Sequence, residues 1–470
     1  MYKIGLIGLG PMGNNLARNF ASKNFSTLVY NRTYDKTADF INDFRPEFSQ
    51  DTLEGAKTIE EFIEKLERPR KIVLLIKAGE PTDQVINQIA PLLEKGDIII
   101  DMSNAWYKDT QRRSKDLEEK GLTFIGCGIS GGEEGALRGP SLMPGCSDYA
   151  WDQTKPLFEA ISAKDFSNGP CVTHIGIDGA GHYVKMVHNG IEYSIMQIIA
   201  ESYEILRKIY GQKPEQIRAI FEKFNNGKLR SFLIEITEKV LAQKDEFQSE
   251  QHLIDFILDQ AEQKGTGKLT SIDALDRGIA VPSITEAVNA RIISSQKRLR
   301  ENFAPIFSKN VTEITIDDEA IKELENSLHT TMIISYAQGL NLIKTAAQEE
   351  NWQINISEIL RIWQGGCIIR AELLKTLQSA YQGQDNPTHI FEIPTIQNIL
   401  STEISDLKTT VQKGLSADLY LPCYTSALNY FQGFTTEKLP ANMIQGLRDF
   451  FGAHTYHRTD REGIFHTKWN

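Results

Sequence analysis

The chain has 470 residues, of which 41% are hydrophobic and 24% are charged, and its formal net charge is -11. This length predicts two or three domains of ordinary globular composition. The negative charge argues against a nucleic-acid surface, which needs clustered Lys and Arg, but it is compatible with a local basic pocket for a small anion. The five cysteines are scattered and form no C-x-x-C pair, which indicates reduced thiols and no metal site.

Two features of the chain bear on its location. No apolar run approaches the roughly 20 residues that a membrane helix needs. A strand pattern begins at residue 3, which leaves no room for a signal peptide. We therefore expect a cytoplasmic protein with no membrane contact.

Short apolar runs alternate with amphipathic stretches in the first third of the chain. We expect strands at 3–7, 27–30, 71–76, 97–101, 122–125 and 172–175. The spacers show helical periodicity, for example at 53–66. This alternation predicts a Rossmann-type, doubly wound parallel sheet.

From residue 179 to about 440, helical patterns dominate and strand signals are scarce. We predict a dinucleotide-binding domain at 1–178, an all-α domain at 179–438 and a C-terminal tail at 439–470. The tail has too little apolar periodicity to build a core of its own, so it must lie against something else. Phe221, Gly227 and Arg230 recur as Trp363, Gly366 and Arg370 at similar offsets, which leaves open an internal duplication.

A glycine-rich turn follows the first expected strand and precedes a helical pattern: Gly8, Leu9, Gly10, Pro11, Met12 and Gly13. Glycine permits the tight turn and lets the backbone approach a pyrophosphate, and the helix N-terminus adds partial positive charge. Because a strand precedes the motif and a second strand ends about 20 residues later, the context favours a dinucleotide site.

The end of the second strand carries Asn31, Arg32 and Thr33, where NAD enzymes usually place a carboxylate. A guanidinium can bind a 2′-phosphate, so we predict NADP as the cofactor. The alternative is that Arg32 is a solvated loop residue. The coenzyme site that we predict also includes Lys77, Ala78, Gly79 and Asn104.

Residues 126–135 are rich in glycine and follow an expected strand. They form either a plain connecting loop or a nest of backbone N–H groups for an anion, with Ser130 as a further donor. The composition leaves both interpretations open.

The segment 181–193 carries a narrow polar stripe on an otherwise apolar cylinder. Lys185, His188, Asn189, Glu192 and Tyr193 occupy positions i, i+3, i+4, i+7 and i+8, which share one helical face. A surface helix shows the inverse pattern, so this helix is expected to be buried and to face an internal polar cavity. The alternative is a satisfied core network in which Lys185 pairs with Glu192.

Residues 263–268 combine glycines with Lys264 and Thr266, which suits a phosphate monoester but does not form a Walker A motif. A plain basic turn is the alternative. Arg291, further along the chain, is by its local sequence alone expected to be an exposed helix residue.

Four stretches, 129–135, 184–193, 264–268 and 451–456, together resemble the motifs of the 6-phosphogluconate dehydrogenase family, within the β-hydroxyacid dehydrogenase superfamily. The resemblance extends over essentially the whole chain. It implies oxidative decarboxylation of 6-phosphogluconate to ribulose 5-phosphate and CO2 with reduction of NADP, a step of gluconate utilization in the pentose phosphate pathway. It also implies a homodimer in which the tail of one subunit completes the active site of the other, and it requires no metal.

The resemblance implies roles for single residues. Lys185 is similar to the base that takes the C3 hydroxyl proton, and Glu192 to the acid that protonates C1. The expected contacts with the substrate carboxylate, its hydroxyls and the nicotinamide are Ser130, Gly131, Gly132, His188, Asn189 and Asn104. The expected phosphate ligands are Tyr193, Lys264, Thr266 and Arg291, together with Arg448 and His454 from the other subunit.

The chain departs from the family pattern at Cys146, Leu269 and Gln364, where Gly, Trp and Arg are usual. Two other functions fit parts of the pattern. A smaller β-hydroxyacid dehydrogenase would share the fold and the lysine but would lack the second helical half and the tail. A non-catalytic NADP-binding protein would have lost Lys185 or Glu192.

Overall fold

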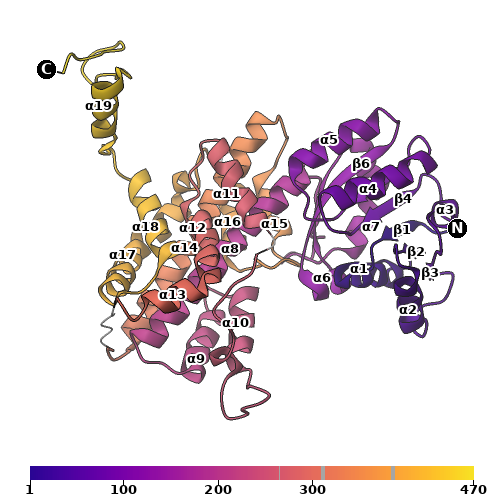
Figure 1. The fold of residues 1–470 in the computed structure, drawn as a ribbon, viewed down its shortest axis with the longest axis horizontal. Helices are drawn as coiled ribbons and strands as arrows, with labels where there is room; N and C mark the ends of the chain where they lie inside the picture. Colours follow the sequence, from indigo (N-terminus) through magenta and orange to yellow (C-terminus); the bar gives the residue numbers. More distant parts are fainter. Residues whose placement is uncertain (264, 308–312, 383–386, 470) are drawn as a thin grey trace.

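The structure is a computed structural model that describes residues 1–263, 265–307, 313–382 and 387–469. A seven-stranded sheet forms the centre of the N-terminal part (Figure 1). The strands are β1 (Ile4–Ile7), β2 (Thr27–Tyr30), β3 (Leu53–Gly55), β4 (Lys71–Leu74), β5 (Ile98–Asp101), β6 (Thr123–Ser130) and β7 (Ser141–Gly145). Their order is β3-β2-β1-β4-β5-β6-β7, and all neighbours are parallel except β6 and β7.

Helices cover both faces of this sheet because its strands carry apolar side chains on each side. Leu6 and Val73 pack in one cluster with residues of α1 and α7, whereas Ile7 and Leu74 pack in another with residues of α3 and α4. The helices of this part are α1 (Pro11–Ser22), α2 (Tyr34–Phe44), α3 (Ile59–Glu64), α4 (Glu80–Ile89), α5 (Tyr107–Glu118), α6 (Gly132–Arg138) and α7 (Asp148–Ile161). The predicted doubly wound sheet is confirmed.

Two local predictions were wrong, and one of two open alternatives is excluded. The stretch 53–66 is not one helix, because Leu53–Gly55 pairs with β2 as the edge strand and α3 begins after Thr58, whose hydroxyl accepts from the N–H of Glu61. Residues 172–175 form no regular strand and make only single bridges, such as that of Val172 with Leu142. The glycine-rich stretch 126–135 is not a plain loop, since it contains the end of β6 and the start of α6.

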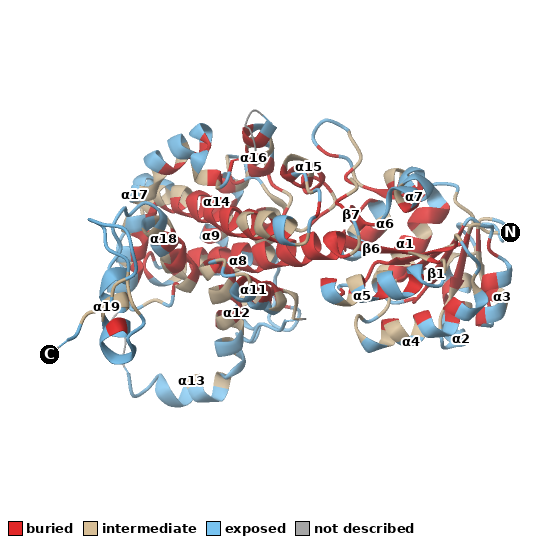
Figure 2. Ribbon diagram, turned by 90° about the horizontal axis from the view of Figure 1, so that it is seen from above, coloured by how far each residue is buried: buried red, intermediate tan, exposed pale blue. Residues whose placement is uncertain are grey.

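Helices account for the regular structure of the second part. They are α8 (Ala180–Lys208), α9 (Pro214–Asn225), α10 (Phe232–Ala242), α11 (Thr266–Asp276), α12 (Pro282–Ser295), α13 (Lys297–Phe303), α14 (Asp318–Glu349), α15 (Ile356–Ile362), α16 (Leu373–Gln382), α17 (Pro394–Ser416), α18 (Pro422–Phe434) and α19 (Ala441–Gly452). Figure 2 shows α8 and α14 as the two mostly buried helices along the middle of this part. Of the described helices, none is long and apolar enough to cross a membrane.

The predicted limits of the domains, 178/179 and 438/439, lie between α7 and α8 and between α18 and α19. The division into domains at these residues stays a prediction.

The start of α8 packs directly against β6 and β7. A methyl group at Gly181 would lie 2.1 Å from the carbonyl oxygen of Met143 and 2.3 Å from that of Gly126. A methyl group at Gly128 would lie 2.4 Å from the Cβ of Lys185. Glycine on both elements therefore lets the helix touch the sheet, and it fixes the height of Lys185 above the strands.

Several contacts in the second part join its earlier and later segments. The hydroxyls of Ser194 in α8 and Ser335 in α14 lie 2.8 Å apart where the two helices pack together. Phe232 donates its N–H to the carbonyl of Arg370, and Glu372 donates to the carbonyl of Arg230. These reciprocal bonds join the two segments whose sequences echo one another, so they fit an internal duplication.

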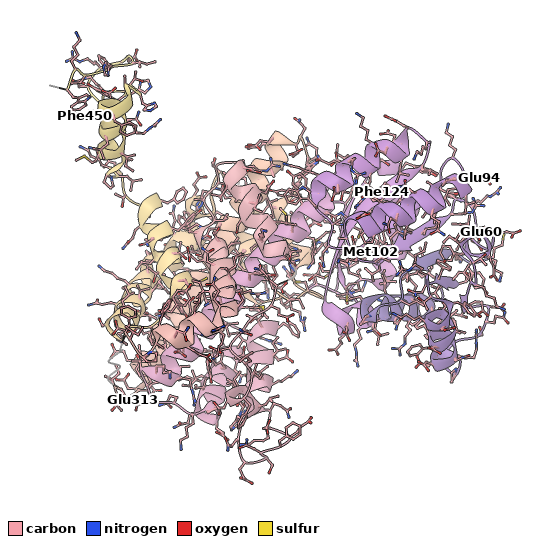
Figure 3. The ribbon with its side chains drawn as sticks, viewed as in Figure 1. Glu60, Glu94, Met102, Phe124, Glu313 and Phe450 are labelled. Carbon is pink, nitrogen blue, oxygen red and sulfur yellow. The ribbon has the colours of Figure 1, made fainter. Side chains whose placement is uncertain are left out.

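The C-terminal tail stands away from the rest of the chain, as α19 and the labelled Phe450 show (Figure 3). Of the described residues 439–469, Asp449 alone is buried. Its carboxylate accepts from the N–H groups of Thr455 and Thr467 and from the ring nitrogen of Trp469. The tail is thus held in shape by one buried carboxylate, while Phe451 remains 73% exposed.

Gly181→Ala should destabilise the protein by about 1–3 kcal/mol, because the added methyl group meets backbone atoms that cannot rotate away. A matched control is Gly433→Ala in α18, where a methyl group would meet nothing within 4 Å. Alanine there should stabilise the helix by up to about 1 kcal/mol. Urea unfolding followed by circular dichroism compares the two; equal midpoints would contradict the close approach of α8 to the sheet.

Candidate active site

A cavity of about 850 Å3 lies between the carboxyl edge of the sheet and the polar stripe of α8. The sheet side contributes the glycine-rich turn and the loops that follow β4, β5 and β6. The helical side contributes α8, α11 and α12. Its lining includes Gly10, Pro11, Met12, Gly13, Lys77, Asn104, Ser130, Gly131, Gly132, Lys185, Asn189, Glu192, Tyr193, Thr266 and Arg291. These residues come from seven separate segments of the chain and face one cavity. The cavity lies at the carboxyl ends of the strands, where open α/β sheets bind their ligands.

The turn after β1 has the form that a dinucleotide needs. Gly8 has a φ of 108°, and a methyl group there would lie 2.5 Å from the carbonyl of Leu75. A methyl group at Gly13 would lie 1.9 Å from the carbonyl of Gly8, so α1 can start close to the strand only with glycine. Gly10 faces open space, which leaves the backbone accessible to a pyrophosphate at the N-terminus of α1. These residues fit a dinucleotide.

Asn31 supports this turn from the end of β2. Its side-chain oxygen accepts from the N–H of Leu9 at 3.3 Å. Neither Gly8 and Leu9 nor Asn31, Arg32 and Thr33 line the cavity, and the same holds for Ala78 and Gly79. Arg32, the residue after Asn31, is exposed.

Lys185 and Glu192 both line the cavity from one face of α8. Lys185 is 6% exposed, and burial lowers the pKa of its ammonium group, while the carboxylate of Glu192 and Cys367 raise it less. Burial likewise raises the pKa of Glu192, against the opposing charges of Lys185 and Arg291. Both shifts favour neutral forms, an amine that accepts a proton and a carboxylic acid that donates one.

His188 sits behind this pair and links it to the strand side. It is fully buried, and burial followed by the charge of Lys185 holds its pKa well below the usual value. Its Nε2 lies 3.2 Å from the hydroxyl of Ser130, and its Nδ1 lies 3.4 Å from Lys185 Nζ and 3.1 Å from the Asn189 side-chain oxygen. His188 does not line the cavity itself, so it orients neighbours that do.

The other end of the cavity carries positive charge. The guanidinium of Arg291 lies 3.6 Å above the ring of Tyr193 and donates to the carbonyl of Glu262 at 3.2 Å. Thr266 begins α11 after Gly265, whose φ of 91° requires glycine. Arg291 is half-buried rather than fully exposed. Lys264, also predicted here, lies outside the described residues.

Gly131 and Gly132 are the part of the glycine-rich stretch that reaches the cavity. Their φ values of 136° and 64° turn the chain from β6 into α6, and both residues line the cavity. Gly126 and Gly128, by contrast, lie inside β6 and make room for α8.

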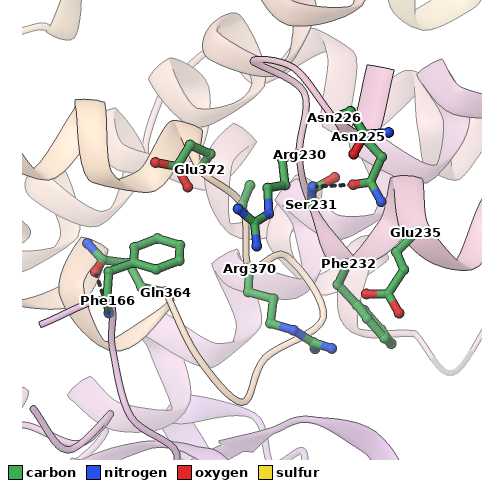
Figure 4. A pocket seen from close by; sticks show the side chains of 11 residues that line it. Phe166, Asn225, Asn226, Arg230, Ser231, Phe232, Glu235, Gln364, Arg370 and Glu372 are labelled. Atoms are coloured by element: carbon green, nitrogen blue, oxygen red, sulfur yellow. Dashed lines mark hydrogen bonds between the residues drawn. The ribbon is translucent and has the colours of Figure 1, made fainter. Parts of the chain in front are cut away.

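The sequence did not predict several residues that line the cavity, among them Ile368, Glu133 and Met196. Ile368 follows α15 and the pair Gly365 and Gly366, which was the one signal of a turn at this place. Gln364 and Arg370, near Ile368 in the sequence, line a second cavity of about 570 Å3 together with Arg230 (Figure 4). Gln364 there donates to Gln378 and accepts from the N–H of Phe166.

Arg448 and His454 lie on the tail and do not line the cavity of their own chain. The separation of the tail from the body leaves both residues available to another molecule.

These features define a two-part, dinucleotide-binding protein with a buried lysine and a glutamate facing the cleft between its parts. The matching family models make the class specific: residues 3–176 match the "NAD binding domain of 6-phosphogluconate dehydrogenase", and residues 181–469 match "6-phosphogluconate dehydrogenase, C-terminal domain". The chain belongs to the 6-phosphogluconate dehydrogenase family.

Individual proteins of this family match the chain over nearly their full lengths. The chain is 47% identical to the NADP(+)-dependent, decarboxylating 6-phosphogluconate dehydrogenase of Bacillus subtilis, covering 99% of both chains. It is 44% identical to the decarboxylating 6-phosphogluconate dehydrogenase of Lactococcus lactis, covering 99% of this chain and 98% of that one. The Plasmodium falciparum 6-phosphogluconate dehydrogenase, solved in its apo form and in complex with NADP+ and with 6-phosphogluconate, superimposes with a TM-score of 0.95 at 44% identity, covering 99% and 100%.

Glu192→Gln should lower the pKa of Lys185 further, because it removes the negative charge that favours the ammonium form. Carbon NMR of reductively methylated protein, with the Lys185 signal assigned by its loss in Lys185→Met, measures this pKa. Glu133→Gln is the matched control, since Glu133 lines the same cavity but does not contribute to the shift of Lys185. An unchanged or raised pKa in Glu192→Gln would show that the two groups do not interact.

Proposed function

We propose that this protein oxidises and decarboxylates 6-phosphogluconate to ribulose 5-phosphate and CO2 while NADP is reduced. The observation that carries the proposal is the pair Lys185 and Glu192, which face one sheltered cavity beside a dinucleotide turn. Bound NADP supplies the hydride acceptor for the substrate. The match of the family model to 181–469 includes the second helical half, which argues against a smaller β-hydroxyacid dehydrogenase.

Lys185 serves as the base in this scheme. Its lowered pKa leaves a share of the amine neutral, so Nζ can accept the C3 hydroxyl proton as the C3 carbon is oxidised. The ammonium that results can donate a hydrogen bond to the new C3 carbonyl oxygen. Because that ketone accepts the electron pair as CO2 leaves, the cation stabilises the negative charge that develops on oxygen.

Glu192 completes the reaction as the acid. Its raised pKa keeps a share of the carboxyl protonated, so it can deliver a proton to C1 of the enediol. Ser130, Gly131 and Gly132 offer donors for the substrate carboxylate, and Asn104 and Asn189 serve its hydroxyls and the nicotinamide. His188 holds Ser130 and Asn189 in place from behind them. Tyr193, Thr266, Arg291 and Lys264 are the phosphate ligands of the same subunit.

We further infer a homodimer in which Arg448 and His454 reach the phosphate end of the partner's site. The tail exposes large apolar side chains on α19, as expected of a segment that buries them against another chain: Met443, Ile444, Leu447, Phe450 and Phe451. We propose that Arg32 selects NADP by binding its 2′-phosphate. We also propose that the protein is cytoplasmic.

Lys185→Met should abolish NADPH formation but preserve NADP binding, because it removes the base without altering the turn after β1. Absorbance at 340 nm together with CO2 release measures turnover, and calorimetry measures binding. Lys208→Met, at the exposed end of the same helix, should retain full activity. Substantial turnover by Lys185→Met would refute its role as the base, and hydride transfer without CO2 release in the unaltered protein would refute the reaction.

The tail is tested by mixing two inactive variants, Lys185→Met and the double variant Arg448→Ala/His454→Ala. If the tail acts on the partner's site, each mixed dimer contains one intact site, so random pairing restores about a quarter of the activity. The partners are exchanged by mild denaturation and refolding, and each variant refolded alone is the control. If the tail acts within its own subunit, every site in the mixture lacks one component and no activity returns.

A further inference from the structure

Arg113 of α5 is a buried cation outside the cavity, and it joins two of the loops that form the cavity. Its side chain is 2% exposed. Nε and Nη2 donate to the two carboxylate oxygens of Asp83 at 2.8 and 3.1 Å, and Nη2 also donates to the carbonyl of Gly79 at 3.0 Å. Gly79 and Asp83 belong to the loop and first turn that follow β4.

The remaining side of the guanidinium faces the next strand. Nη1 lies 3.5 Å from Oδ2 of Asp101, the last residue of β5, whose side chain is fully buried. The other oxygen of Asp101 accepts from the N–H of Ser103 at 2.9 Å. Ser103 and Asn104 line the cavity opposite Lys185, just as Lys77 does from the loop after β4.

The same helix also contacts the helix of the proposed base. Thr110, one turn before Arg113, has its hydroxyl 2.7 Å from Nδ1 of His182. His182 is buried in α8, three residues before Lys185. Helix α5 is therefore bonded to the loop after β4, to the end of β5 and to the start of α8.

We propose that Arg113 is a positioning residue for the nicotinamide half of the coenzyme, acting through the Gly79 carbonyl and the Asp101 carboxylate. This proposal rests on the proposed function, because that function places the nicotinamide beside Lys185. The adenosine half, with its 2′-phosphate, would then extend toward Arg32, on a loop that Arg113 does not contact. The planar guanidinium has several donors and can bond to Asp83, Gly79 and Asp101 at once. The single ammonium group of a lysine cannot, so lysine cannot replace Arg113.

The neighbouring Arg112 provides a matched control. It donates to both oxygens of Asp83 at 2.9 and 3.0 Å, but from the solvent side, with its side chain 49% exposed. Its other ion pairs are with Asp109 and Asp116 of the same helix, and among the described residues it does not contact Gly79 or Asp101. An exposed ion pair of this kind contributes little, whereas the buried one holds two loops.

The test compares Arg113→Lys with Arg112→Lys. Lysine keeps the buried charge, so the fold should survive, and circular dichroism checks it. Calorimetry gives the Kd of NADP and of 2′,5′-ADP, which lacks the nicotinamide half. In Arg113→Lys we expect the Kd of NADP to rise about tenfold while that of 2′,5′-ADP stays within twofold, because displaced loops misplace only the near half of the ligand. Arg112→Lys should leave both binding constants unchanged.

Two outcomes would overturn the proposal: an unchanged Kd for NADP, or parallel losses for NADP and 2′,5′-ADP, which would indicate general loosening of the sheet domain. Asp101→Asn keeps the size of the side chain and removes its charge, so it should repeat the selective loss even if Arg113→Lys is poorly folded. Absence of NADPH formation by the unaltered protein would refute the proposed function separately, since the two binding constants need no turnover.

Discussion

The contact between α8 and the sheet is the constraint on which the site depends. Gly126 and Gly128 on β6 and Gly181 on α8 remove the side chains that would otherwise keep helix and strands apart. Lys185 lies one turn further along α8, so the same contact places its amine beside the carboxyl ends of the strands, where the dinucleotide turn also lies. A helix held further from the sheet would leave the amine in water, with its pKa near that of free lysine.

Burial and charge act against each other at Lys185 and Glu192, and burial is the larger effect on both. Each group would be ionised in water at neutral pH, and their mutual attraction favours the ionised pair. Since removal from water disfavours both charges, the cavity moves the two pKa values toward each other. That is the condition for one group to accept a proton and the other to donate one at the same pH.

Features that depend on the periodicity of the sequence could be predicted from it. Features that depend on contacts with segments distant in the sequence mostly could not. The stripe from Lys185 to Tyr193 identified a buried helix because its spacing alone assigns the residues to one face. β3 was missed because Leu53–Gly55 is stabilised by pairing with β2 at the sheet edge rather than by its own pattern. Ile368 and Arg113 were missed for the same reason: their partners are distant in sequence, and neither belongs to a motif.

The later half of the helical part, around α14, has a physical role that follows from α8. The side of α8 away from the sheet must also be excluded from water, and α14 does this through fully buried side chains. Val187 and Ile191 of α8 pack at Gly339 of α14, where a methyl group would lie 2.5 Å from the end of the Ile191 side chain. Sheet and second half thus enclose one helix from two sides. The later half of the helical part, which contributes Ile368 to the cavity lining, therefore also helps to set the pKa values on which the proposed chemistry depends.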